Sequence, residues 1–494
     1  MKKQFCLLFI LLLLLTGPVT AQRILSLDSC RALAVKNNKK LLIGDDNIEA
    51  AEYEHKAAKT KFLPKLTADA SYIYNARTTH LLSKDQRNTL KNLGTLSGTK
   101  FQQTAASIAQ QFPELAPLLQ SLGTATVPAL NNLGSTINRA FETDMHNIFA
   151  GSLVLTQPLY MGGRLKAYDK ITNYTKLLLG NERNEALQQT ILETDQAYWQ
   201  VVSLANKKEL AESYVKMLQK IDGDIQKMYT QGVATKANTL TVRVKLNEAE
   251  LTLTKVDNGL SLSRMLLCQI CGLPINDKIQ LQDEKNKNLS TRPCILQPDT
   301  IVAYQNRQDL QMLEQATKIS DQNVKLARSL FRPQLGAFGA YTLSNPNVYD
   351  GFHNKFGGNV SVGLALHIPL WTWNEGRYHV RAAQAEARAS RHLYQDAKEK
   401  IDLQLNQAKY KVDEANKQLI TAMNNLDKAN ENLHYADVGF HEGVIATSDL
   451  LEAQTAWLEA QTQKIDAQID IRMTEATLLK ALGILDGTNQ TIIN

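Results

Sequence analysis

The most regular pattern of apolar residues lies between Arg377 and Val438, a segment without glycine or proline. Its apolar residues recur at alternating spacings of three and four, with large residues at one heptad position and alanine at the other: Leu405, Ala408, Val412, Ala415, Leu419, Ala422, Leu426, Ala429, Leu433 and Ala436. This spacing predicts a coiled coil in which alanine lets neighbouring backbones approach. At about 1.5 Å per residue, a helix of roughly 60 residues reaches about 90–100 Å, which predicts an elongated architecture.

A second pattern, alternation of apolar and polar positions, predicts four strands at about 65–75, 148–158, 334–344 and 358–369. In the last of these, Val360, Val362, Leu364, Leu366 and Ile368 alternate with smaller or more polar residues. Each strand has about ten residues, the length that a tilted transmembrane strand needs. A small soluble sheet has the same periodicity, so this pattern alone leaves both possibilities open.

The chain contains an internal duplication. Pro158-Leu159-Tyr160 matches Pro369-Leu370-Trp371, an offset of 211 (369 minus 158), and the same offset relates Gly272-Leu273 to Gly483-Ile484. Upstream, Phe62 to Leu66 matches Phe331 to Leu335 with an offset of 269 (331 minus 62). The difference of 58 (269 minus 211) is an insertion in the first repeat. A period this long makes each repeat a whole module.

These patterns together predict the organisation of the chain. The first repeat spans 22–273, with an insertion at 76–147, and a linker at 274–299 leads to the second repeat at 300–484 and a tail at 485–494. Each repeat opens with a helix, at about 27–61 and 300–330, followed by two strands and two long helices. We expect the long helices at about 164–230, 236–271, 377–439 and 447–482. Glycines and prolines in the insertion predict short helical pieces.

The first residues predict a secretory signal peptide at 1–21. Lys2 and Lys3 precede an apolar run from Leu7 to Leu15 and a small-residue cleavage zone that ends at Ala21. The formal net charge of +6 is small for this length and the charges are interspersed, so no nucleic-acid partner is expected. No catalytic, cofactor-binding or metal-binding motif is found, so we expect no enzyme, cofactor or metal. Cys268 and Cys271 form a CxxC in the apolar end of a predicted helix, which favours core packing over a redox or disulfide role.

Four strands cannot close a barrel, and lipid does not tolerate an open strand edge. If the strands span a membrane, several chains must pool them, and physics alone does not choose between two and three chains. The small residues of the alternate faces, such as Ser152 and Ser361, suit a lumen. Tyr160, Trp371 and Trp373 lie where strands give way to helices, which fits a membrane-interface belt or ordinary packing at a bend. The alternative to a channel is a secreted coiled-coil structural or adhesion protein.

The whole mature chain resembles the TolC family of outer-membrane efflux proteins. The resemblance rests on motifs that recur in order in both repeats: Phe-Leu-Pro-Lys-Leu and Phe-Arg-Pro-Gln-Leu, Gln-Pro-Leu-Tyr-Met-Gly-Gly-Arg and Ile-Pro-Leu-Trp, and Gly-Val-Ala-Thr and Gly-Val-Ile-Ala-Thr-Ser-Asp-Leu-Leu. It implies a mainly α fold with four strands per protomer, pooled by a homotrimer into a twelve-stranded outer-membrane barrel above a long α-helical coiled-coil tunnel in the periplasm. It also implies the exit duct of a tripartite efflux pump or type I secretion system, with outer-membrane lipid, a periplasmic adaptor and an inner-membrane pump as partners.

The resemblance assigns roles at the periplasmic tip of that fold. Gly232, Val233, Gly443 and Val444 fall in the turns that contact the adaptor, and the insertion faces the outside of the cell. Asp449 and Glu452 match acidic rings of the tip gate, although they could instead be an N-cap and its capping-box partner.

The family's polar and ionic lock is missing at the tip. The matching positions hold Phe440, Ile445 and Asn238, which lack the hydroxyl, the cation and the partner carboxylate. Phe440 and Ile445 could instead form an apolar constriction that gates by dewetting.

Overall fold

The computed structural model describes residues 23–76, 82–111, 116–140, 146–286, 299–350 and 353–486. The expected leader at 1–21 lies outside these residues, as do most of the tail and parts of the linker and the insertion. The chain divides into a helical unit (Met1–Lys56, Tyr168–Val324 and Val380–Asn494) and a second unit (Ala57–Ala167 and Lys325–His379). None of the helices in the described part of the chain combines the length and hydrophobicity that a bilayer span requires.

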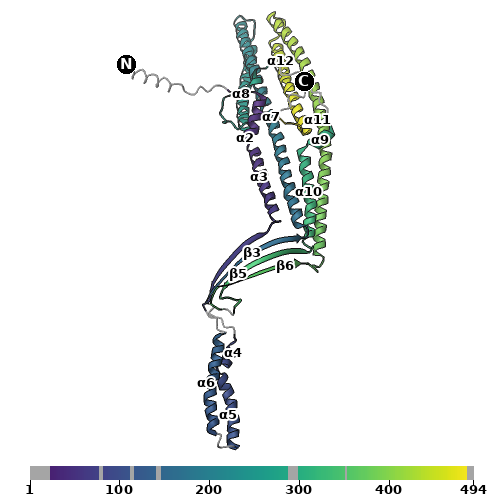
Figure 1. The fold of residues 1–494 in the computed structure, drawn as a ribbon. Coiled ribbons are helices and arrows are strands. Elements are labelled where there is room, and N and C mark those ends of the chain that lie inside the picture. Colours follow the sequence, from purple (N-terminus) through teal and green to yellow (C-terminus); the bar gives the residue numbers. More distant parts are fainter. Residues whose placement is uncertain are drawn as a thin grey trace, which may run out of the picture. The chain divides into compact units, whose positions relative to one another are not determined.

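Two long helical hairpins dominate the helical unit (Figure 1). The first consists of α7 (Arg164–Thr230) and α8 (Lys236–Ile270), and the second of α11 (Glu375–His441) and α12 (Thr447–Ala481). The heptad pattern accounts for their packing, because Leu405, Ala408, Val412, Ala415, Leu419, Ala422, Leu426 and Ala436 are all buried. The fold class, mainly α with a few strands and an internal repeat, is confirmed.

Each repeat opens with two consecutive helices, where the sequence predicted one. These are α2 (Leu27–Asn37) and α3 (Lys39–Thr60) in the first repeat, and α9 (Thr300–Asn306) and α10 (Gln308–Ser329) in the second.

The breaks fall at Asn38 and Arg307, which are equivalent positions at the offset of 269 (307 minus 38), and both residues have extended backbone. Side-chain hydrogen bonds are made at both breaks. The Asn38 side chain accepts from the Lys40 backbone N–H at 2.9 Å. Arg307 donates to the Ala481 carbonyl at 3.3 Å and pairs with Asp309.

The end of the first hairpin packs on α2 and a small parallel sheet, in which β1 (Arg23–Leu25) pairs with β4 (Ile279–Leu281) ahead of a 3₁₀ helix, η2 (Gln282–Lys285). Cys30, Cys268 and Cys271 are fully buried in this core, and all three are free thiols. The Cys271 thiol contacts the Cys30 carbonyl oxygen at 3.6 Å. This packing agrees with the interpretation of the CxxC as part of a core.

The second unit contains one antiparallel sheet with the order β2-β3-β5-β6 (Figure 1). Its strands are β2 (Lys65–Tyr74), β3 (Asn147–Met161), β5 (Gln334–Asn345) and β6 (Gly357–His367). β3 extends three residues beyond the predicted end at 158, because a bulge between Pro158 and Tyr160 lets the strand continue past the proline. Each repeat contributes one hairpin, and β3 pairs with β5 to join the two repeats.

The two faces of the sheet differ in chemistry. Cross-strand pairing places large apolar residues on one face, among them Leu66 with Leu155, Leu153 with Tyr341, and Tyr341 with Val360. The other face carries smaller and more polar residues, such as Asp69 beside Ser152 and Ser152 beside Thr342. A sheet with this division can face lipid on one side and a lumen on the other.

The described residues of the insertion form three helices, α4 (Lys84–Lys91), α5 (Leu93–Gln111) and α6 (Ala116–Ala140). The first is capped by Ser83 and Gln86 in a capping box. The sequence predicted short pieces separated by breakers, but Gly98 and Gly134 lie inside helices and Pro128 lies inside α6. Packing of α5 against α6 and of α4 against α6 offsets the low helix propensity of these residues.

Candidate channel tip and membrane interface

The turn of the first long hairpin is closed by backbone and side-chain hydrogen bonds. Gly232 adopts a left-handed backbone (φ 77°), and the Val233 N–H donates to the Met228 carbonyl at 2.9 Å. Thr235 caps α8 by accepting from the Asn238 N–H at 3.3 Å. The Thr235 hydroxyl in turn donates to the Asn238 amide oxygen at 2.7 Å, which fixes the direction of that amide.

The turn of the second hairpin repeats this backbone but not its cap. Gly443 has φ 76°, and the Val444 N–H donates to the Gly439 carbonyl at 2.9 Å, as in the first turn. Glycine is required at both positions because other residues are strained at these angles. The N-cap of α12 is Ala446, which has no side-chain hydrogen bond to offer. The second turn is therefore held less by its own side chains than the first.

The two turns are linked through Asn238. Its side-chain nitrogen donates to the Thr447 hydroxyl at 3.4 Å, and Thr447 is buried at the start of α12. Of the three predicted lock positions, Asn238 thus contacts the other hairpin. The sequence did not single out Thr447, whose only signal was its place in the motif after Gly443.

Phe440 and Ile445 face different surroundings in one chain. Phe440 is only 6% exposed and belongs to a core formed by all four long helices, with Leu218, Val242 and Leu450 among its members. Ile445 is partly buried and lies against Gly439, where an added Cβ would be 2.7 Å from its Cδ1. The structure does not bring these two side chains to one exposed surface. An apolar constriction formed by both of them is therefore not supported by the packing of Phe440.

Asp449 and Glu452 are exposed on the first turns of α12. Asp449 is three residues past the N-cap Ala446, and its carboxylate accepts from the Ser448 hydroxyl at 3.0 Å. The alternative in which Asp449 is the N-cap and Glu452 its capping-box partner is therefore wrong, since the helix begins at Thr447. Neither carboxylate caps the helix, and a negative charge in the first turn interacts favourably with the helix dipole.

The valines of the two turns are the most exposed apolar groups of the tip. Val233 is 70% exposed and Val444 is 79% exposed, at equivalent positions after the two turn glycines. When a partner covers an exposed valine, apolar surface is removed from water, which favours binding.

The predicted aromatic belt lies in the second unit. Tyr160 is near the end of β3, while Trp371 and Trp373 lie between β6 and α11. The two indoles are 75% and 81% exposed, and their ring centroids are 5.6 Å apart in an edge-to-face arrangement. All three aromatics are exposed, so packing at a bend within one chain does not account for them.

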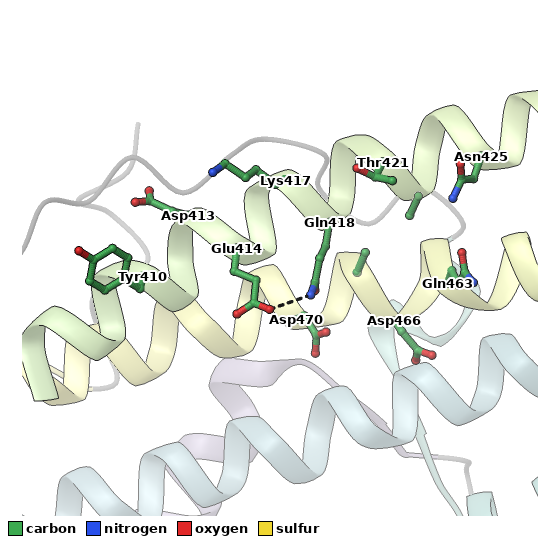
Figure 2. A pocket seen from close by; sticks show the side chains of 12 residues that line it. Tyr410, Asp413, Glu414, Lys417, Gln418, Thr421, Asn425, Gln463, Asp466 and Asp470 are labelled. Atoms are coloured by element: carbon green, nitrogen blue, oxygen red, sulfur yellow. Dashed lines mark hydrogen bonds between the residues drawn. The ribbon is translucent and has the colours of Figure 1, made fainter.

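A groove of about 740 Å³ runs between α11 and α12 (Figure 2). Polar side chains of both helices line it, and Gln418 donates to Glu414 at 3.3 Å across one helical turn. Asp466, on the α12 side, pairs with Lys207 of α7 at 2.6 Å. No sequence pattern predicted this groove. The described residues contain no group of three or more His, Cys, Asp or Glu side chains that could hold a metal ion.

Two long helical hairpins linked at their turns, and a sheet with one apolar and one more polar face, are features of an export channel of the outer membrane. The chain belongs to the outer membrane efflux protein family, whose model matches residues 99–273 and 302–484. It is accordingly an efflux channel of the outer membrane, with a tunnel that extends into the periplasm.

Solved structures of similar fold agree with this assignment. The chain is similar to CusC (14% identity, TM-score 0.72, covering 94% of this chain and 93% of that one). It is also similar to the outer membrane protein VceC from Vibrio cholerae (14% identity, TM-score 0.71, covering 92% of this chain and 96% of that one). A third similar structure is the open state of the MtrE outer membrane channel from Neisseria gonorrhoeae (16% identity, TM-score 0.69, covering 94% of this chain and 91% of that one). A comparison with curated protein sequences finds no match.

Proposed function

We propose that three copies of this chain pool their strands into a twelve-stranded barrel and their long helices into a periplasmic tunnel. The observation that carries this proposal is the four-stranded sheet, whose outer strands β2 and β6 each have one partner among the described residues. Unpaired backbone N–H and C=O groups in lipid cost several kcal/mol each, so these edges need strand partners. Three chains give a barrel wide enough for a lumen, whereas an eight-stranded barrel is filled by side chains.

The channel serves as the exit duct of a tripartite efflux pump or a type I secretion system, and it catalyses no reaction. A periplasmic adaptor contacts the tip at Gly232, Val233, Gly443 and Val444, and connects it to an inner-membrane pump. The exposure of both valines supports this assignment, because an adaptor would cover apolar surface that one chain leaves in water. Tyr160, Trp371 and Trp373 anchor the duct at the interface of the outer-membrane lipid.

The tip gate is held by polar and charged groups of the second turn. Three copies of Asp449 and of Glu452 form two carboxylate rings, which concentrate cations and can bind a polyvalent ion. Ile445 narrows the opening, Phe440 supports it from within the core, and the hydrogen bond from Asn238 to Thr447 ties the hairpins together.

The mass of the detergent-solubilised protein tests the oligomer. The protein is extracted from outer membranes in a mild detergent, and its mass is measured with the bound detergent subtracted. Three times the mass of the mature chain is expected. A water-soluble monomer or dimer that needs no detergent would overturn the proposal in favour of a coiled-coil structural protein.

Channel currents in planar bilayers test the gate. A trivalent hexammine cation on the periplasmic side should block the current, and Asp449→Asn with Glu452→Gln should remove the block. Glu459→Gln is the matched control, because Glu459 is also exposed on α12 but lies about two turns farther along the helix. Equal block in the control and the double variant would contradict the rings.

A further inference from the structure

The two repeats pair their strands in the same register. In the first repeat Lys65 lies opposite Thr156, and in the second Gln334 lies opposite His367. These are equivalent positions, since 334 minus 65 is 269 and 367 minus 156 is 211. The relation holds along both hairpins, so the duplication is conserved in backbone hydrogen bonding as well as in sequence motifs.

The pairing of β3 with β5 shows how one repeat joins the next. Leu153 lies opposite Tyr341, Leu155 opposite Gly339, and Thr156 opposite Phe338. β3 is the second strand of its repeat and β5 is the first strand of the following one. The two outer strands of the sheet have the same relation. β6 is the second strand of its repeat, and β2 is the first strand of its repeat.

We propose that β6 pairs with β2 of a second copy of the chain in the register of β3 with β5. This inference rests on the proposed oligomer and specifies the interface that closes it. Applying the two offsets places Leu364 opposite Tyr72, Leu366 opposite Ala70, and His367 opposite Asp69 of the next copy. The same transposition places the bulge at Leu370, the equivalent of Leu159.

The end of β6 supports this register. β3 continues to Met161, whereas β6 stops at His367, which is equivalent to Thr156. The residues of β3 beyond Thr156 are paired only with β5. Their equivalents follow β6, begin at Ile368 and have no strand partner among the described residues. Leu370 is 88% exposed in this unpaired segment. A second copy would extend β6 through it and cover these side chains.

The chemistry of the strands supports it independently. Asp69 is the only acidic residue in the four strands, and His367 is their only histidine. A register derived from backbone pairing alone places these two residues opposite each other. The equivalent internal pair, Thr156 and Phe338, cannot form such a contact. An imidazole N–H can donate to a carboxylate, and a directly opposed pair of this kind stabilises antiparallel strands.

The proposed junction between chains repeats the internal junction only along the strands. Gly162 lies so close to the end of α10 that an added Cβ would be 2.6 Å from the Ser329 carbonyl oxygen. The equivalent of Gly162 is Trp373, whose side chain excludes the same close approach to a neighbouring chain. The repeated contact therefore ends where the strand gives way to the helix.

Cysteine pairs across the interface test the register. Residues directly opposite in antiparallel strands have Cα atoms about 4.5–5.5 Å apart, and diagonal neighbours about 7–8 Å apart, beyond the reach of a disulfide. Ala365→Cys with Ser71→Cys, and Leu366→Cys with Ala70→Cys, should form disulfides between chains on mild oxidation. Two pairs are used because adjacent positions alternate between hydrogen-bonded and non-hydrogen-bonded geometry.

The expected product is a ladder of two and three linked chains on a non-reducing gel. The matched controls are Ala365→Cys with Ile73→Cys and Ala365→Cys with Asp69→Cys, which represent slips of two residues, together with each single variant. Linkage in a slipped control but not in the expected pairs, in protein of trimeric mass, overturns the register and leaves the proposed function intact. A monomeric mass in detergent contradicts the proposed function itself.

Exchange of these two residues gives a second readout. Asp69→His and His367→Asp each place two side chains of the same type opposite each other, and each should lower the temperature at which the trimer dissociates. The double variant restores an opposite pair and should recover most of that loss. Additive losses in the double variant would show that the two residues do not face each other.

Discussion

Gly162 and Trp373 occupy equivalent positions in the two repeats, and both have a left-handed backbone, with φ of 63° and 50°. The following residues, Gly163 and Asn374, repeat this relation with φ of 91° and 63°. The strand-to-helix turn is therefore conserved in backbone while its side chains differ completely. A non-glycine residue in this region costs about 1–3 kcal/mol and commonly marks a functional constraint. For Trp373 that constraint is an exposed indole at the proposed membrane interface.

The first prediction concerns this turn. Because of the strained φ alone, Gly162→Ala should lower the free energy of unfolding by about 1–3 kcal/mol. The total loss should be larger than that, since the added Cβ also clashes with Ser329 and Arg332. Gly163→Ala should lower it less, since the nearest atom to an added Cβ is the end of the Arg332 side chain at 4.0 Å. Denaturant titration of the detergent-solubilised protein measures both. Equal losses would show that φ alone determines the effect.

A second prediction concerns the link between the hairpins. Thr447→Val keeps the shape of the side chain but removes the hydroxyl that accepts from Asn238. The hairpins should separate more easily, and the mean current of the closed channel in planar bilayers should rise. Ser448→Ala is the matched control, because Ser448 is exposed and its side chain contacts only Asp449. Unchanged current in Thr447→Val would rule out a gating role for this bond.

A third prediction concerns the buried thiols. The hydrogen bond with Cys271, together with burial, raises the pKa of the Cys30 thiol far above its usual range, and full burial keeps reagents from Cys268 and Cys271 as well. Cys30, Cys268 and Cys271 should not react with a maleimide in the folded protein and should all react once it is unfolded. Mass spectrometry of the digested protein measures this. Val444→Cys supplies an exposed thiol as the positive control; rapid labelling of Cys268 or Cys271 before unfolding would contradict the core assignment.

A fourth prediction concerns pH. Burial acts to raise the pKa of Asp309, but hydrogen bonds and charge from Arg307, with the Leu310 N–H, outweigh it and hold the pKa below its usual range. A lowered pKa stabilises the fold at pH values above the unfolded value of about 3.9, and this contribution is lost as pH falls through the folded value.

Asp309→Asn should therefore destabilise the protein at pH 7 and destabilise it less near pH 3. Asp321→Asn, on the same helix and in an exposed pair with Arg391, should have a small effect throughout. The midpoint of denaturation at both pH values distinguishes the two variants. A loss for Asp309→Asn that is the same at pH 7 and pH 3 would exclude the ion pair as its cause.

The long helices and the four strands could be predicted because their apolar patterns persist along most of each segment and recur in both repeats. The breaks at Asn38 and Arg307 could not, since neither position holds glycine or proline and the helix ends through local side-chain hydrogen bonds. In the insertion, Gly98 and Gly134 indicated breaks, but helix packing prevails over propensity there.

At the tip, the turn glycines were evident from the repeated motif. The contact of Asn238 with Thr447 joins residues 209 positions apart, and the burial of Phe440 depends on four helices at once. Neither follows from the spacing of residues along one segment.

The pairing of β3 with β5 also affects how the channel assembles. Because these strands belong to one chain, their junction forms at the high effective concentration of tethered partners and does not depend on protein concentration. In the proposed trimer, junctions between β6 and β2 form by encounter of separate chains, so they are the ones whose rate varies with expression level. In that assembly the internal duplication converts half of the contacts between hairpins from a bimolecular step into an intramolecular one.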